Sequence, residues 1–243
     1  MFQAMKVFDQ WRDRAQMLTP PLPWDRPHWR DRSGPLVVLL HGLWRGKRAM
    51  DPLARALDHD GFSTLNLPYP SARMPLSELV NLVRTQVAEF AGNQPVHFIT
   101  HSLGGILARA LLADPVPWVA GKIVMLAPPN GGSEIVDWVR AHPPLDRLLG
   151  PTGCSLGSDG VCSELPALPP EIETAVIMGN RQTIPFFKNL LDPENDGIVS
   201  AAKGSLDGLR GFTVIDADHT FMPMHPEAIR LTLQFLKTGE WPD

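Results

Sequence analysis

The most informative stretch of the chain is Val96-His97-Phe98-Ile99-Thr100-His101-Ser102-Leu103-Gly104-Gly105. Residues 96–100 are an apolar run that predicts a buried strand, and residues 106–113 have the composition of a helix. Strand, sharp turn and helix, with Ser102 at the apex, is the arrangement that holds a hydroxyl clear of the backbone. Such a tight turn needs small neighbours, and Gly104 supplies one, whereas Thr100 stands where glycine is usual. Ser102 is therefore a candidate nucleophile, and the alternative is a serine that only caps the helix.

Outside this stretch, short apolar runs alternate with segments of helical period. Near-continuous apolar strands separated by helices predict an α/β fold, a mostly parallel central sheet flanked by helices on both faces. In such sheets ligands bind at the carboxyl ends of the strands, where we therefore expect the chemistry. The predicted strands are residues 36–40, 62–67, 96–100, 122–127, 174–178 and 212–215.

Two regions depart from the alternation. Residues 1–34 are predicted to form an N-terminal helix and a proline-rich linker, ahead of a main domain of residues 35–243. Residues 130–171 form a long interruption, which we expect to be a lid-like insertion or, equally, a stiff proline-rich loop.

The N-terminal helix has an apolar face. Apolar residues recur at Phe2, Met5, Phe8 and Trp11, and Ala15 and Leu18 continue the face. We expect this face to pack on the domain, and transient contact with a lipid surface or a partner is the alternative.

Composition and charge exclude several classes of protein. The 243 residues carry 22 Lys and Arg against 26 Asp and Glu, a net charge of −4, without the basic patch of a nucleic-acid-binding protein. No apolar stretch approaches the length that spans a bilayer. The first residues do not resemble a secretory signal, which favours a cytoplasmic location. A disulfide between Cys154 and Cys162 would instead argue for an oxidising compartment.

A second strand end is placed to stabilise an oxyanion. The apolar run at 36–40 leads into His41-Gly42-Leu43-Trp44, and a glycine there lets the backbone turn its amides toward the cleft. Acyl transfer needs two such donors. The expected pair is the amide of Leu43 and the amide of Leu103, directly after Ser102.

A serine nucleophile also needs a base and a carboxylate, in the chain order serine, acid, histidine. His219 follows the strand at 212–215 and is the expected base, since His225 precedes Pro226 and starts the last helix. Asp196, before Gly197 on a turn, is the expected acid.

Other carboxylates are less suitable as the acid. Asp192 is the second choice, and Asp216 and Asp218 are too close in sequence to His219 to orient its ring. The turn at Asp196 is also explained by turn chemistry alone.

From about Leu36 to Gly239 the chain resembles the alpha/beta-hydrolase superfamily, most closely its bacterial lipase and esterase branch. The resemblance implies that Ser102 is the nucleophile, His219 the base and Asp196 the orienting acid, with the amides of Leu43 and Leu103 as oxyanion donors. It also implies that the stretch 128–133 lines the acyl pocket. It is carried by 41–43, 100–105, 127–133, 195–197 and 218–219.

The expected function is hydrolysis of carboxylic esters with hydrophobic acyl groups, small-molecule or lipid, without a metal or cofactor. Trp44, Pro129 and Met222 are expected to line the substrate site. A thioesterase, amidase or polyester hydrolase would use the same triad. A non-catalytic hydrolase-fold module that binds an apolar ligand is the alternative outside catalysis.

Overall fold

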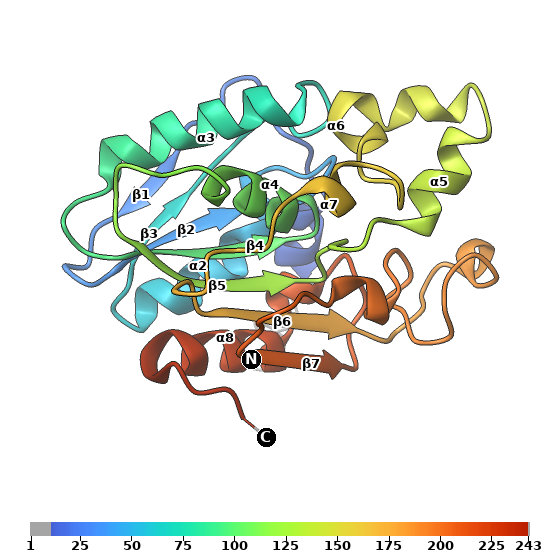
Figure 1. The fold of residues 1–243 in the computed structure, drawn as a ribbon. Helices are drawn as coiled ribbons and strands as arrows, with labels where there is room; N and C mark the ends of the chain where they lie inside the picture. The colour runs from blue at the N-terminus through green and yellow to red at the C-terminus, as the bar shows by residue number, and fades with distance from the viewer. Residues whose placement is uncertain (1–10, 243) are drawn as a thin grey trace.

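The protein is described here by a computed structural model, which covers residues 11–242, and its centre is one twisted sheet (Figure 1). Within that range the sheet has seven strands in the order β1-β3-β2-β4-β5-β6-β7, and only β1 runs antiparallel, against β3. The mostly parallel sheet confirms the predicted fold class. The strands are β1 (His28–Arg30), β2 (Leu36–Leu40), β3 (Ser63–Asn66), β4 (Val96–His101), β5 (Ala120–Leu126), β6 (Thr174–Gly179) and β7 (Gly211–Ile215).

Helices cover both faces of the sheet, as the alternating pattern predicts (Figure 1). On one face α3 (Leu76–Phe90) and α4 (Leu103–Leu112) pack on the strands, and on the other α2 (Asp51–His59) and α8 (Pro226–Thr238) do so. The pleat of β2 shows the division, because Val38 belongs to the first core and Val37 to the second. The five residues of β2 are all buried, which explains their unbroken apolar run.

The segment predicted to be a proline-rich linker is partly incorporated into the sheet. Its residues His28–Arg30 form β1, an edge strand whose pairing with β3 no local sequence pattern indicates. Two arginines fasten it further, because Arg30 and Arg32 lie 2.8 and 2.5 Å from the carboxylate of Asp58 on α2. Residues 28–32 are therefore joined to the domain that follows them.

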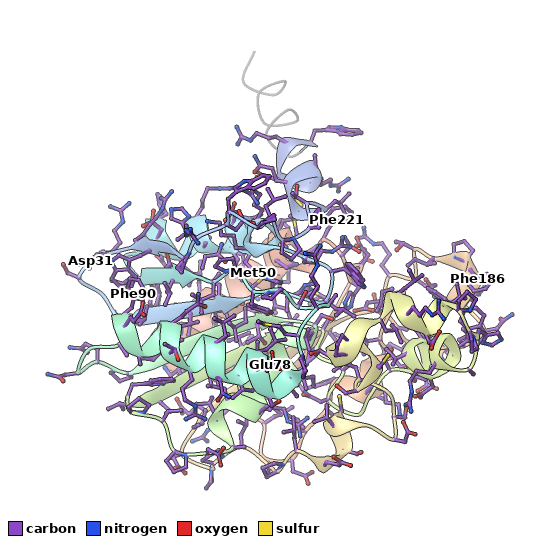
Figure 2. All side chains as sticks on the ribbon, turned by 90° about the horizontal axis from the view of Figure 1, so that it is seen from above. Asp31, Met50, Glu78, Phe90, Phe186 and Phe221 are labelled. Atoms are coloured by element: carbon purple, nitrogen blue, oxygen red, sulfur yellow. The ribbon has the colours of Figure 1, made fainter. Side chains whose placement is uncertain are left out.

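The N-terminal helix contacts the domain through a different face from the one predicted. Residues 11–17 are helical and stand off the body of the molecule in Figure 2. Trp11 and Leu18 are 72% and 48% exposed, so the prediction that they pack on the domain is wrong. Asp13 and Met17, four residues apart on one face, make the contact: Met17 is buried and Asp13 pairs with Arg55 at 2.5 Å. Phe2, Met5 and Phe8 lie outside the described residues.

The insertion at 130–171 is folded and packed at the end of the sheet to which the strand arrows point (Figure 1). One hydrophobic cluster joins Val136, Leu149 and Leu156 of the insertion to Leu103 and Ile106 of α4. The insertion contains α5 (Glu134–Arg140), η2 (Leu145–Leu148), α6 (Gly150–Cys154) and α7 (Val161–Glu164).

A buried arginine of α4 also holds the insertion. The guanidinium of Arg109 donates hydrogen bonds to the carbonyl oxygens of Asn130, Cys162 and Leu165 at 3.1 to 3.3 Å. The insertion is thus fixed to the helix that follows the candidate nucleophile.

The two cysteines are free thiols. Cys162 is buried, which raises the pKa of its thiol to about 11, and Cys154 lies 3.6 Å from the carbonyl oxygen of Asp146. No helix within residues 11–242 is long and apolar enough to cross a membrane.

Candidate active site

Ser102 occupies a strained turn between a strand and a helix. β4 ends at His101 and α4 begins at Leu103, which leaves Ser102 alone at the apex with φ 53° and ψ −122°. A positive φ is unfavourable for any residue with a Cβ, and such strain persists where the surrounding structure imposes it. Here the Ser102 amide donates to the carbonyl oxygen of Leu126 at 2.9 Å. The turn therefore presents the serine side chain at the carboxyl end of the sheet.

Small residues allow this turn to sit close to the neighbouring strand. A Cβ on Gly104 would lie 2.4 Å from the carbonyl oxygen of Leu40, a distance that no side chain tolerates. Thr100, which departs from the usual glycine, is completely buried and faces Gly105, where the missing side chain leaves room for it. The departure at Thr100 is thus compatible with the tight turn.

His219 and Asp196 are hydrogen-bonded to each other at the same end of the sheet. Nδ1 of His219 lies 2.7 Å from Oδ2 of Asp196, and the His219 amide donates to the Asp196 carbonyl oxygen at 3.0 Å. The second carboxylate oxygen accepts hydrogen bonds from the amides of Ile198 and Val199 at 3.0 and 2.8 Å. An ionised carboxylate only accepts, so Nδ1 carries the hydrogen and Nε2 is left as an acceptor.

The other residues considered for the acid and base lie elsewhere. Asp192 is exposed, Asp216 pairs with Arg181 at 3.1 Å, and Asp218 accepts a hydrogen bond from the amide of Phe221. His225 precedes the first residue of α8. Of these carboxylates, Asp196 is the one that the structure places beside His219.

Ser102 and His219 line the same cavity, which has a volume of about 310 Å³. Residues at or shortly after strand ends, such as His101 and Pro129, contribute to its lining, and so do Val136 and Leu156 of the insertion. The complete lining is Gly42, Leu43, Trp44, Arg45, His101, Ser102, Pro129, Ser133, Val136, Leu156, Ile184, Ile198, Val199, His219 and Thr220.

The two predicted oxyanion donors belong to segments on either side of Ser102. Leu103 is the first residue of α4, so its amide has no acceptor within the helix. The Leu43 amide makes no hydrogen bond to any residue in 11–242. A Cβ on the preceding Gly42 would lie 3.2 Å from Cβ of Ser102, which shows how closely this loop approaches the serine.

The loop that carries Leu43 is held from behind. The hydroxyl of Tyr69 donates to the carbonyl oxygen of His41, and the two rings stack with centroids 3.9 Å apart. The amide of Trp44 donates to Oγ of Ser71 at 3.1 Å, and its indole Nε1 donates to the carbonyl oxygen of Leu148 in the insertion at 2.7 Å. The backbone around Leu43 is therefore fixed on both sides.

Of the three residues predicted to line the substrate site, Trp44 and Pro129 line the cavity that contains Ser102 and His219. Met222 does not. Met222 lies in the short helix η5 (Met222–Met224), and its side chain is fully buried in the core between the sheet and the helices α2 and α8, near Gly179.

A second cavity of about 340 Å³ shares Trp44 and is lined by the proline-rich segment 20–27 and by residues 68–73.

Two lining residues carry functional groups that we did not predict. His101 places Nε2 2.9 Å from the carbonyl oxygen of His219, and burial lowers the pKa of His101 well below 6.5, so it is neutral and donates. Its position beside Ser102 at a strand end is the signal that would have identified it. Arg45 is half-buried and lies two residues after Leu43.

Within residues 11–242, no cluster of three or more His, Cys, Asp or Glu side chains is placed to hold a metal ion.

The sequence was compared with models of protein families. The family model described as the alpha/beta hydrolase family matches residues 37–230, which include most of β2, all of β3 to β7, and Ser102, Asp196 and His219. The chain belongs to the alpha/beta hydrolase family. A comparison with curated proteins gives no match.

Solved structures of a lipase and of two carboxylesterases have a similar fold. The mature lipase BlEst2 of Bacillus licheniformis has a TM-score of 0.70 at 18% identity, over 87% of this chain and 96% of that one. The metagenomic carboxyl esterase MGS0156 has a TM-score of 0.60 at 20% identity, over 86% and 80% of the two chains. The carboxylesterase CesB of Bacillus subtilis has a TM-score of 0.52 at 12% identity, over 96% and 98%.

Proposed function

We propose that this hydrolase cleaves carboxylic esters of hydrophobic acyl groups, with Ser102 as the nucleophile, His219 as the base and Asp196 as the orienting acid. One observation carries the proposal. Ser102, on its strained turn, lines the same cavity as His219, whose Nδ1 is bound to the buried carboxylate of Asp196. These three groups in these roles are the requirement for acyl transfer through a serine.

The first half of the reaction forms an acyl-enzyme. Oγ of Ser102 attacks the ester carbonyl carbon while Nε2 of His219 takes its proton, and the amides of Leu43 and Leu103 donate to the resulting oxyanion. The bond to the alkoxy oxygen then breaks, and His219 returns the proton to it as the alcohol leaves. Asp196 keeps the ring in the required tautomer and stabilises the imidazolium.

The second half releases the acid. His219 takes a proton from water, whose oxygen attacks the acyl carbon, and the same two amides hold the new oxyanion. The bond to Oγ of Ser102 breaks and Oγ regains the proton from His219, which restores the enzyme.

The lining of the cavity supports a hydrophobic acyl group. Leu43, Val136 and Leu156 belong to one hydrophobic cluster and all three face the cavity, and Ile184, Ile198 and Val199 add further apolar surface. Mostly apolar lining with a few fixed polar groups is typical of a site for a small organic ligand. A lipase and carboxylesterases among the structures of the same fold agree with ester hydrolysis.

The test is hydrolysis of 4-nitrophenyl esters of increasing acyl length by the wild-type protein and by Ser102→Ala. We expect activity on medium acyl chains and a loss in kcat of about 10⁶ in the variant. Ser163→Ala, at an exposed serine outside the cavity, is the matched control. A kcat of Ser102→Ala within about tenfold of the wild-type value, in place of the expected large loss, would overturn the mechanism. The same acyl group presented as a thioester, an anilide and a polyester then ranks the possible leaving groups.

A further inference from the structure

Arg45 is a cation in the wall of the Ser102 cavity, and no residue in 11–242 pairs with it. Its side chain lines the cavity, and its guanidinium makes no ion pair or hydrogen bond to any residue in 11–242. Arginines nearby behave differently, since Arg48 lies 2.9 Å from Asp25 and Arg55 lies 2.5 Å from Asp13. Arg45 therefore lines the cavity with five donors that no residue in 11–242 uses.

Burial makes the missing partner costly. Arg45 is half-buried, and desolvation lowers the pKa of its guanidinium, which nevertheless stays charged near neutral pH. A partly buried charge without an anion nearby is unfavourable, and a cavity walled by apolar groups strengthens its attraction for an incoming anion. A ligand that supplies the anion would remove this cost.

No residue of the described lining neutralises Arg45. The lining contains no Asp or Glu, and its other titratable side chains are His101 and His219. The proposed catalytic carboxylate, that of Asp196, is completely buried and already bound by His219 and two amides. Among described residues the cavity therefore carries a single fixed positive charge.

The position of Arg45 relates this charge to the reaction. Its amide donates to the carbonyl oxygen of Gly42 at 3.2 Å, which closes a tight turn around Leu43. Gly42 in turn packs against Ser102. The cation is thus attached to the same short loop as a proposed oxyanion donor, and the backbone of this loop lies close to the nucleophile.

We propose that Arg45 binds an anionic group, a carboxylate or a phosphate, on the ester that Ser102 attacks. The inference rests on the proposed function and narrows its substrate class to esters whose apolar acyl group also carries a negative group. The planar guanidinium fork matches both anions and binds them through two parallel hydrogen bonds. The apolar insertion alone favours esters whose acyl group carries no charge. If Arg45 binds an anion, these uncharged esters should be the poorer substrates.

The kinetic test compares matched esters. 4-Nitrophenyl hexanoate, the mono-4-nitrophenyl ester of adipate and the 4-nitrophenyl ester of 6-phosphohexanoate differ only at the far end of the chain. For wild type we expect a higher kcat/KM on one or both charged esters. Arg45→Gln should lower the ratio of charged to neutral kcat/KM about tenfold or more, the size of one charge-assisted hydrogen bond, and Arg45→Lys should keep part of it. Whichever anion gives the larger drop identifies the group that binds.

The control removes a charge without touching the cavity. Arg73 is exposed and lies outside the lining of the Ser102 cavity, so Arg73→Gln should leave the ratio within about twofold, since exposed charges are screened by salt. An unchanged ratio in Arg45→Gln overturns the inference about Arg45 and leaves the proposed function intact. A wild-type protein that cleaves none of the esters contradicts the proposed function instead.

A binding measurement tests Arg45 without turnover. Hexanoate and hexyl phosphate are titrated calorimetrically into Ser102→Ala and into Ser102→Ala with Arg45→Gln. We expect binding to the first and a Kd weakened about tenfold or more in the second. Equal affinities, or binding of hexyltrimethylammonium as tight as that of the anions, would overturn the inference. Matching thermal unfolding curves of the two proteins show that a loss of binding does not come from misfolding.

Discussion

Asp196 and His219 are joined by two hydrogen bonds, one between the side chains at 2.7 Å and one between the backbones at 3.0 Å. The carboxylate is completely buried, and both of its oxygens accept hydrogen bonds. The pair therefore holds the imidazole in one orientation and one tautomer before any substrate binds.

Asp196→Asn should preserve the fold and remove most of the activity. The amide oxygen can still accept from the amides of Ile198 and Val199, while the amide nitrogen donates to Nδ1 of His219 and forces its hydrogen onto Nε2. The ring can then no longer accept the serine proton, and we expect kcat to fall about 10⁴-fold, as in the serine protease triad. Steady-state kinetics measures the change, with the exposed Asp192→Asn as control. A loss below tenfold would contradict the orienting role.

Gly104→Ala should destabilise the turn at the nucleophile. The added Cβ would lie 2.4 Å from the carbonyl oxygen of Leu40, so strand or helix must shift. We expect the free energy of unfolding to fall by about 1–3 kcal/mol, the usual range for overpacking, together with a loss of activity because Ser102 moves. Urea denaturation measures the first effect. Gly92→Ala, where a Cβ meets no atom within 4 Å, is the control and should be close to wild type.

Buried histidines should make the protein sensitive to mild acid. His97 accepts a hydrogen bond from the amide of Lys122 at 2.8 Å, and burial lowers its pKa to about 4 from an ordinary value of about 6.5. Below the ordinary pKa the unfolded chain binds a proton that the folded chain refuses. Stability is therefore complete above about pH 6.5 and falls as the pH drops toward 4.

The expected loss from His97 alone is about 2 kcal/mol at pH 5. His97→Asn keeps an acceptor for Lys122 and should flatten the fall in unfolding free energy between pH 7 and pH 5 by roughly that amount. The exposed His59→Asn should leave the slope unchanged. If the unfolding free energy of wild type and of His97→Asn fell equally between pH 7 and pH 5, His97 would not be the cause of the acid sensitivity.

Trp44→Phe should loosen the insertion locally. The variant loses the hydrogen bond from Nε1 to the carbonyl oxygen of Leu148, a link between the loop that carries Leu43 and η2. A single hydrogen bond contributes about 0.5–1.5 kcal/mol, so amide exchange in residues 145–154 should accelerate up to about tenfold while β4 stays protected. Trp24→Phe, at an exposed indole, is the control. Unchanged exchange in the insertion would show that the link does not restrain it.

Much of the fold and of the candidate site follows from local patterns. Buried parallel strands have apolar runs along their whole length, so β2, β4 and β6 are recognisable without neighbours. The sequence also indicates where catalytic residues should lie, because the carboxyl ends of parallel strands meet at one edge of the sheet. Ser102, His219 and Asp196 were selected in this way, and they lie at that edge of the structure.

Features that depend on distant partners could not be predicted. β1 is three residues long and is stabilised by β3 and by Asp58, neither of which is near it in sequence. The face of the helix at 11–17 depends on Arg55 in the same way. Met222 was misplaced because adjacency to His219 in sequence does not decide on which side of the turn its side chain lies. That no residue in 11–242 pairs with Arg45 is likewise visible only once its surroundings are known.

The most direct test of the central claim, that Ser102 is a nucleophile activated by His219 and Asp196, is covalent labelling with a fluorophosphonate. The folded protein is treated with the reagent, digested and mapped by peptide mass spectrometry. We predict one adduct, on Ser102, that disappears in Ser102→Ala and after denaturation and that forms far more slowly in His219→Ala. Absence of labelling in the folded wild type, or equal labelling of wild type and Ser102→Ala, would contradict the account.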